Sequence, residues 1–255
     1  MQANGNTILV TGGGSGIGRA LAESLHSRGN RVVVAGRRLS LLQEVVRANP
    51  GIDAIELDIE HAASIPGFAE ALCRRHPGLN VVVHNAGIMR PEDLRGGAAS
   101  LADAEATIAT NLLGPIRLTA ALLPHLLRQR SATLVTVTSG LAFVPLASFP
   151  TYCATKAAIH SWTESLRYQL QGTPVEVVEL PPPYVQTELT GAHQAADPRA
   201  MPLAEFVAES VRLLTASPTP AEVLVERVKP LRFAAQGDYQ GFFKMFNDAM
   251  AGERH

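Results

Sequence analysis

Short apolar runs alternate along the chain with longer segments in which apolar residues recur three or four positions apart, as they do in helices. The runs predict strands at Thr7–Thr11, Arg31–Gly36, Ala54–Leu57, Asn80–His84, Thr133–Thr138 and Val175–Glu179. The segments between them predict helices at Gly16–Arg28, Ser40–Ala48, Ser64–Arg75, Ala102–Arg128 and Thr151–Gln171. Strands that alternate with helices form βαβ crossovers, so we expect an α/β fold with a doubly wound, mostly parallel sheet and helices on both faces.

The last quarter of the chain is less regular. Pro181–Pro183 ends the sixth strand, and a polar loop follows it. Beyond the loop we expect a helix over Ala204–Thr215 and a seventh strand near Glu222–Val225, which gives a sheet of six to seven strands. The tail Phe233–Met250 should pack on the body or on a neighbouring subunit through its apolar side. That side carries Phe242, Phe243, Phe246 and Met250.

Composition excludes several classes of function. The 255 residues include 22 Lys and Arg against 23 Asp and Glu, a net charge of −1, whereas nucleic-acid binding needs a basic surface. The two cysteines are far apart and the histidines are scattered, so we expect neither a disulfide framework nor a metal site. The uncharged stretch Ser131–Thr155 is too rich in hydroxyl residues and proline to span a membrane. The short, polar N-terminus does not resemble a signal peptide, and we expect a cytoplasmic protein.

A glycine-rich turn follows the first strand and opens the first helix. The residues that we expect to contact a ligand there are Gly12, Gly14, Ser15, Gly16, Ile17 and Gly18. Glycines let the backbone turn tightly, and a helix N-terminus offers free N–H groups that suit a diphosphate. A plain flexible turn is the alternative, but the position of the glycine-rich segment between a strand and a helix favours dinucleotide binding.

The end of the second strand indicates which dinucleotide binds. An acidic residue there would accept hydrogen bonds from the adenosine ribose and repel a 2′-phosphate. This chain has Gly36 at that place, followed by Arg37 and Arg38, whose guanidinium groups suit a phosphate. We therefore predict NADP(H) in preference to NAD(H); the alternative is that both arginines are merely solvated.

Tyr152 and Lys156 are four residues apart at the start of a predicted helix and so face one side. A nearby cation favours the phenolate, which would lower the pKa of the tyrosine and make it a better acid–base catalyst. Ser139, at the end of the fifth strand, could hydrogen-bond a substrate carbonyl oxygen. Within the long helix, Pro115 deprives the carbonyl of Asn111 of its helical partner, which leaves it free to hold a water, although a packing bend is the alternative.

These motifs together resemble the short-chain dehydrogenase/reductase family. Thr11–Gly18 matches its TGxxxGxG turn, Asn85-Ala86-Gly87 its NAG motif, and Tyr152–Lys156 its YxxxK motif. Asn111, Ser139, Tyr152 and Lys156 follow the order of the family's catalytic tetrad. The resemblance as a whole covers about residues 5–190. Residues around Ser139 and Tyr152 are also similar to a DltE-like branch of oxidoreductases. The resemblance implies one Rossmann-type domain over residues 1–255, with a cofactor part at about 5–130, a catalytic part at 131–190, a substrate loop at 184–203 and a C-terminal packing segment at 204–255.

The resemblance also implies residue roles. Asp58 and Ile59 would meet the adenine, and Asn85, Ala86 and Gly87 would line the cofactor. Lys156 would grip the nicotinamide ribose beside Tyr152, and Asn111 would anchor a proton-relay water. Pro182, Val185 and Thr187 match the motif that meets the nicotinamide amide, but Pro183 replaces the usual glycine and should stiffen this loop.

The implied activity is an NADP(H)-dependent oxidoreductase that acts on a ketone, an aldehyde or a secondary alcohol, with Tyr152 as general acid and base. The alternatives are a non-catalytic NADP-sensing or partner-binding protein and an isomerase that uses transient oxidation. Family members assemble as dimers or tetramers, so a homo-oligomer is expected, built through the helices at 102–128 and 151–171. The substrate pocket should draw on Ser139, Leu141, Phe143, Phe149, Tyr184 and the loop Thr187–Met201. Arg90 is interpreted as a solvated residue and Cys153 as a small buried one.

Overall fold

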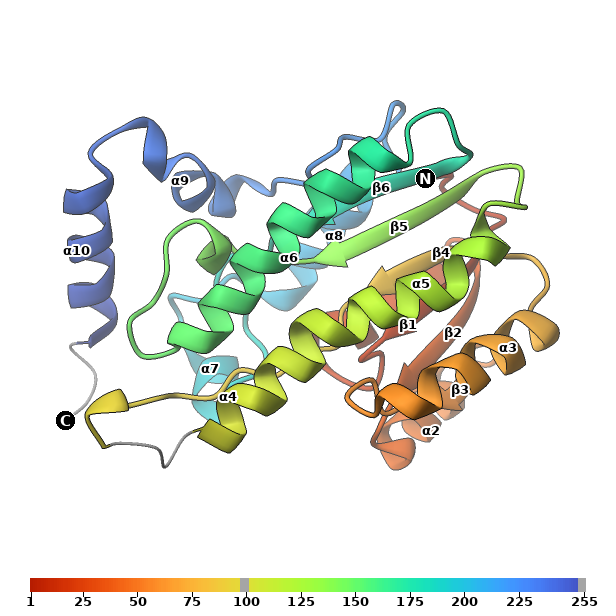
Figure 1. The fold of residues 1–255 in the computed structure, drawn as a ribbon, viewed down its shortest axis with the longest axis horizontal. Helices are drawn as coiled ribbons and strands as arrows, with labels where there is room; N and C mark the ends of the chain where they lie inside the picture. The colour runs from red at the N-terminus through yellow and green to blue at the C-terminus, as the bar shows by residue number, and fades with distance from the viewer. Residues whose placement is uncertain (97–100, 252–255) are drawn as a thin grey trace.

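The computed structural model describes residues 1–96 and 101–251 (Figure 1). Six parallel strands form one sheet in the order β3-β2-β1-β4-β5-β6. The strands are β1 Thr7–Thr11, β2 Arg31–Gly36, β3 Asp53–Glu56, β4 Leu79–His84, β5 Ala132–Val137 and β6 Val175–Leu180. The strand order reverses between β1 and β4, and the crevice outside the carboxyl ends of strands at such a reversal is where ligands bind in doubly wound sheets.

Helices cover both faces of this sheet. The longer ones are α1 Gly16–His26, α2 Leu39–Ala48, α3 Ile65–Arg75, α4 Leu101–Ile108, α5 Gly114–Leu126, α6 Pro150–Gln169, α8 Leu203–Leu214 and α10 Tyr239–Ala251. Two short helices, α7 Ala192–Ala196 and α9 Lys229–Arg232, lie in the last quarter. In Figure 1, α3, α5 and α6 cover the face turned to the viewer, and α8 lies behind the sheet.

Alternate residues of each strand enter different cores. Ile8 and Val10 pack with the residues of α1 and α8, whereas Leu9 packs with α3, α5 and α6. Val81 and Val83 likewise face the first core, and Val82 faces the second. This burial on both sides is the reason why these strands read as continuous apolar runs, and it confirms the predicted doubly wound α/β fold.

Two predicted elements are wrong in detail. The seventh strand near Glu222–Val225 does not form among the described residues; Glu222 makes an isolated parallel bridge with Glu179 of β6. The single helix predicted over Ala102–Arg128 is interrupted by a π-helical turn, η4 Ala109–Leu113, directly before Pro115. The ring of Pro115 cannot donate to the preceding turn, and the backbone widens there instead.

The helical stretch Leu101–Leu126 is long and apolar enough to cross a membrane by length and composition, with a mean hydropathy of 1.3. Its inner side is nonetheless part of the protein core, since Leu118, Leu122 and Leu126 are fully buried beside residues of α3 and α6. A core helix of a doubly wound fold has this composition, because it faces a sheet on one side and neighbouring helices on the others.

Candidate active site

The glycine-rich turn between β1 and α1 lies at the carboxyl edge of the sheet. Gly12 has φ +66° and Gly16 has φ +52°, a left-handed conformation that L side chains rarely adopt. A Cβ at Gly12 would come within 2.9 Å of the Cα of Ala86, and a Cβ at Gly18 would overlap the carbonyl of Gly12. Ser15, which precedes α1, is exposed. The free N–H groups of the first turn of α1 are therefore accessible to an anion.

Thr11 and Asn85 join this turn to the end of β4. The Thr11 hydroxyl accepts hydrogen bonds from the backbone N–H groups of Asn85 at 3.0 Å and Ala86 at 3.1 Å. The Asn85 side-chain amide donates to the Thr11 carbonyl at 3.0 Å. The segment Asn85-Ala86-Gly87 thus lies against the glycine turn, and the Asn85 side chain braces the turn.

The two arginines after β2 take different positions. The Arg38 guanidinium donates to the Ser15 hydroxyl at 3.0 Å, beside the glycine turn. Arg37 instead lies 3.5 Å from the Glu60 carboxylate, and both side chains are partly exposed. Asp58 is exposed at the end of β3, where its carboxylate accepts from the Glu60 N–H at 3.1 Å. Of the two arginines, Arg38 therefore lies beside the glycine turn and Arg37 lies beside Glu60.

Two further residues that are predicted to bind the cofactor, Ile59 and Gly14, lie close to this edge but offer no accessible side chain. Ile59 is buried and fills the space beside Gly114, where a Cβ would come within 2.7 Å of the Ile59 Cγ1. Gly14 packs on α2, with the Cβ of Leu41 3.2 Å from where its own Cβ would lie. Any contact that Ile59 or Gly14 makes with a ligand must therefore come from its backbone.

Ser139, Tyr152 and Lys156 come together where β5 ends and α6 begins. Tyr152 and Lys156 are each 6% exposed, and the Lys156 ammonium lies 5.6 Å from the centre of the Tyr152 ring. The ammonium donates to the Val137 carbonyl at 2.8 Å. The Ser139 hydroxyl accepts from the Leu141 N–H at 3.0 Å. Three of the four predicted catalytic side chains thus meet in one buried place.

Burial dominates the titration of this group. It raises the pKa of the Tyr152 phenol well above its usual value of about 10, although the hydrogen bond with Ser139 acts in the opposite direction. It also lowers the pKa of Lys156 to about 8. The phenol pKa is therefore raised in the protein alone and not lowered as expected, because desolvation outweighs the hydrogen bond with Ser139.

Asn111 lies in the π-helical turn, next to this group. Its side-chain oxygen accepts from the Ile88 N–H at 2.9 Å, and its amide donates to the Ile88 carbonyl at 2.9 Å. The same amide lies 3.3 Å from the hydroxyl of Thr155 on α6. Asn111 therefore joins the loop after β4 to the helix that carries Tyr152.

The loop after β6 closes the other side of the site. The Pro182 carbonyl accepts from the Gly140 N–H at 2.8 Å, which fixes the loop against the end of β5. The Thr187 side chain lies 3.6 Å from where a Cβ of Gly16 would be, so it reaches the glycine turn. Buried Gln194 donates to the Val185 carbonyl at 2.8 Å and to the Thr187 hydroxyl at 3.0 Å. With Pro183 in place of glycine, the loop holds Thr187 against the glycine turn.

A cavity of about 520 Å³ opens directly beside Ser139 and Tyr152. Its apolar lining includes Leu141, Leu146, Phe149, Phe246 and Met250. Its polar and charged lining includes Ser148, Glu92, Asp93, Tyr184 and His193. The predicted pocket residues Ser139, Leu141, Phe149 and Tyr184 all line it.

Phe143 does not line the cavity, so its predicted place is wrong. Its ring makes an edge contact with His160, with 4.9 Å between ring centres, and the Arg232 guanidinium lies over it at 4.8 Å. The chain turns at η5 Gly140–Ala142 after Ser139, and Phe143 then packs against His160 and Arg232 instead of the cavity. Arg90 is exposed and pairs with Asp103.

Cys153 is buried as predicted. Burial raises the pKa of its thiol to about 11, so it is not a ready nucleophile.

Two parts of the site escaped sequence reasoning. Glu92 holds the start of α6, because its carboxylate accepts from the Thr151 N–H at 3.0 Å and from the Thr151 hydroxyl at 2.8 Å. Helix α10 forms a wall of the cavity through Phe246 and Met250. Asn247 anchors that helix, accepting from the Ala147 N–H at 2.7 Å. The apolar side of α10 is visible in the sequence, but the surface that it covers is not.

Known proteins share this arrangement. Residues 6–198 match the short chain dehydrogenase family model. The chain is 39% identical over 250 residues to the uncharacterized oxidoreductase DltE of Bacillus subtilis strain 168, with 97% of this chain and 98% of the relative covered. A short chain dehydrogenase from Burkholderia cenocepacia J2315, solved with NADP, superposes with a TM-score of 0.80 at 26% identity, over 96% of this chain and 98% of that one. A relative from Burkholderia phymatum, solved with NAD, has a TM-score of 0.79 at 20% identity, over 100% and 97%.

A parallel doubly wound sheet, a glycine turn at its carboxyl edge and a buried Ser-Tyr-Lys group beside a cavity define a dinucleotide-dependent oxidoreductase. The chain belongs to the short-chain dehydrogenase/reductase family, as the match over residues 6–198 and the 39% identical relative show. The resemblance predicted from the motifs is therefore confirmed. Of the two solved relatives described above, the first holds NADP and the second holds NAD.

Proposed function

We propose that the chain is an NADP(H)-dependent oxidoreductase that interconverts a ketone or aldehyde and the corresponding alcohol. The observation that carries the proposal is the buried Tyr152, which lines a mostly apolar cavity together with Ser139. The glycine turn, Arg38 and Thr187 fit the cofactor, because they offer helix N–H groups, a guanidinium and a hydroxyl along one edge. When bound, NADPH supplies the hydride.

Tyr152 would act as general acid in the reduction. Burial raises its pKa, so the phenol is protonated at neutral pH and has a proton to give to the developing alkoxide. Ser139 would hold the same oxygen through its hydroxyl. Lys156, with a pKa of about 8, is mostly charged at neutral pH and would stabilise the phenolate left behind.

The cavity suggests the substrate class. Its aliphatic and aromatic side chains favour a substrate of moderate hydrophobicity, and Lys and Arg are missing from its lining among the described residues. Glu92 also lines it, and its carboxylate disfavours an anionic substrate, whereas the Asp93 carboxylate is paired with Arg95. A neutral ketone or aldehyde fits these surroundings.

A substrate panel tests the proposal. Purified protein is mixed with neutral ketones and aldehydes and with either NADPH or NADH, and the loss of the absorbance of the reduced cofactor is followed. We expect turnover of neutral, moderately apolar carbonyls with NADPH. If NADPH binds but no compound of a broad panel causes its oxidation, the result would favour the non-catalytic sensing protein instead.

Replacing Arg38 by Ala should separate the two cofactors. The charge-assisted hydrogen bonds to a 2′-phosphate are lost, so the KM for NADPH should rise about ten- to hundredfold while the KM for NADH hardly changes. Arg37→Ala is the matched control, because Arg37 lies beside Glu60 and its loss should have the smaller effect. Equal effects of Arg38→Ala on both cofactors would reject the assignment of this arginine.

Replacing Phe246 by Ala should widen the substrate range. The Phe246 side chain lines the cavity from α10 and packs against the cluster that contains Tyr152, so its removal adds space beside Tyr152 without changing the glycine turn. We expect kcat/KM to rise for bulky ketones relative to small ones by about tenfold, since one or two methylenes in an apolar pocket are worth that much. Met245→Ala, an exposed position on the same helix, is the control. An unchanged ratio would show that α10 does not contact the substrate.

A further inference from the structure

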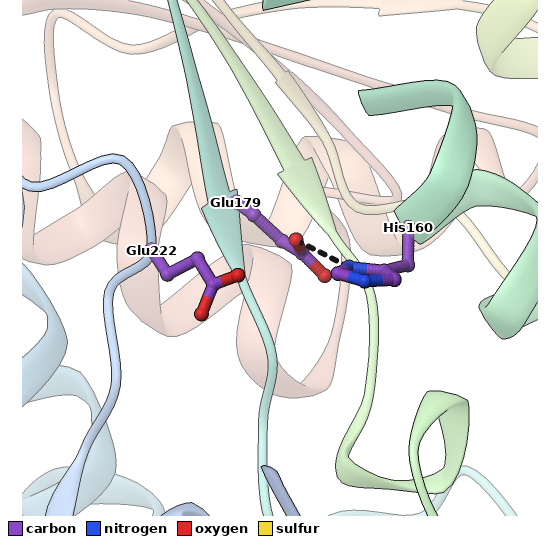
Figure 2. Close-up of side chains that lie close together, drawn as sticks. All are labelled: His160, Glu179 and Glu222. Atoms are coloured by element: carbon purple, nitrogen blue, oxygen red, sulfur yellow. Dashed lines mark hydrogen bonds and ion pairs between the residues drawn. The ribbon is translucent and has the colours of Figure 1, made fainter. Parts of the chain in front are cut away.

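The buried carboxylate of Glu179 lies between the end of β5, which leads to Ser139, and α6, which carries Tyr152 and Lys156. Glu179 of β6 is 0% exposed, and Figure 2 shows it between His160 of α6 and Glu222. The His160 Nδ1 lies 2.8 Å from one carboxylate oxygen of Glu179. The Thr138 hydroxyl donates to the other oxygen at 2.7 Å. Each oxygen of Glu179 thus has a partner from a different element, and the sheet and α6 are joined through one side chain.

The rest of the cluster balances its charge. Arg232 donates to both oxygens of Glu222, at 2.8 and 2.9 Å. Potential ligand atoms of His160, Glu179 and Glu222 lie within 4.8 Å of one another, which is a spacing that a metal ion could use. However, the Arg232 guanidinium already neutralises Glu222, and His160 donates to Glu179. The arrangement therefore favours a network of ion pairs over a cation site.

This network meets the catalytic residues at two points. Thr138 directly precedes Ser139 at the end of β5, and His160 lies one helical turn beyond Lys156 on α6. Lys156 itself donates to the carbonyl of Val137. Two successive residues of the strand end are therefore tied to the helix that carries Tyr152, one through Lys156 and one through Glu179.

We propose that Thr138, Glu179 and His160 are positioning residues that hold the Ser139 hydroxyl in register with the Tyr152 phenol. This inference rests on the proposed reductase function, since it is the reaction that requires the two hydroxyl groups to meet one substrate oxygen. Misplacement of such groups by a fraction of an ångström costs rate, while cofactor binding at the glycine turn is left alone. The effect should therefore fall on kcat and not on the affinity for NADPH.

The charge of His160 gives the network a pH dependence. The hydrogen bond to Glu179 raises the pKa of His160 above its ordinary value of 6.5. Because the folded-state value is the higher one, the stabilisation by the ion pair is fully present below pH 6.5 and is lost as the pH rises through the folded-state pKa. The charged groups that act on His160 are Glu164 on α6, Glu179 on β6 and Glu222. Glu222 is in turn stabilised by Arg232 of α9 and Arg167 of α6.

Three variants test the inference. Thr138→Val removes the hydroxyl without changing the shape, His160→Ala removes the partner of Glu179, and His160→Asn keeps a neutral donor near the Nδ1 position. We expect Thr138→Val and His160→Ala to lower kcat about ten- to hundredfold with an unchanged Kd for NADPH. The double variant should be no worse than the poorer single one, because both act through the same carboxylate. His160→Asn should keep most of the activity, and the ratio of wild-type to H160N kcat should fall as the pH rises.

Thr136→Val is the matched control. Thr136 lies two residues earlier on β5, and its hydroxyl bonds to Thr163 of α6 at 2.9 Å without reaching Glu179. We expect T136V to cost stability but to retain kcat. A kcat of T138V equal to that of T136V would overturn the inference, and so would Zn²⁺ that raises the Tm of the wild type but not of Glu222→Gln. A wild type without turnover would reject the reductase itself, which distinguishes the two failures.

Discussion

Replacing Tyr152 by Phe should reduce kcat by about a hundred- to ten-thousandfold, the usual contribution of a positioned general acid. The phenyl ring keeps the packing of this buried side chain beside Leu146 and Cys153, so the fold and the Kd for NADPH should be retained. The loss should come from the missing proton alone. Stopped-flow reduction of a ketone, together with fluorescence titration of NADPH, measures both quantities.

Tyr168→Phe provides the control on the same helix. Tyr168 is 74% exposed near the end of α6, so its hydroxyl is far from the cavity side of the helix and its removal should leave kcat unchanged. Near-wild-type turnover in Tyr152→Phe would show that another group supplies the proton.

Replacing Gly18 by Ala should strongly weaken dinucleotide binding. The new Cβ would overlap both the Asn85 side-chain amide and the Gly12 carbonyl, so the turn would have to move. Overpacking of this kind costs about 1–3 kcal/mol of stability. Because the turn itself is the expected diphosphate site, we expect the Kd for NADPH to rise at least about a hundredfold, measured by calorimetry.

Gly67→Ala is a closely matched control. Gly67 is the third residue of α3, as Gly18 is the third residue of α1, but nothing lies within 4 Å of where its Cβ would be. An added methyl in an exposed helix should stabilise the protein by about 0.5–1 kcal/mol and leave NADPH binding unchanged. If Gly18→Ala bound NADPH like Gly67→Ala, the glycine turn would not be the diphosphate site.

The sequence was sufficient for the architecture because the strands are buried on both faces. The apolar runs Val32–Ala35 and Val81–Val83 clearly predict buried strands. The alternation of such strands with helices permits few topologies. The prediction of a strand at Glu222–Val225 was wrong. Val223 and Val225 are core residues, but the segment pairs with the sheet through only one isolated bridge, between Glu222 and Glu179. Apolar spacing reports burial, and burial does not require a hydrogen-bonded ladder.

The site was predictable to the extent that its residues follow strand ends. Ser139, Tyr152 and Lys156 meet as expected, because parallel strands deliver their ends to one edge. Two features depend on packing instead. The direction of Phe143 is set by η5, and the depression of the Lys156 pKa is set by burial, which no local motif encodes. The pairing of His160 with Glu179, 19 residues later, likewise needs three dimensions to be seen.

The placement of α10 separates two kinds of change in this protein. The helix contributes Phe246 and Met250 to the cavity and is anchored by Asn247, whereas no residue of the described glycine turn lines that cavity. Mutations in α10 should therefore reshape this cavity, which is the proposed substrate site, and leave the glycine turn, the proposed cofactor site, unchanged. Relatives that share the Ser-Tyr-Lys group and the glycine turn could therefore differ in their metabolic roles through changes in α10 alone.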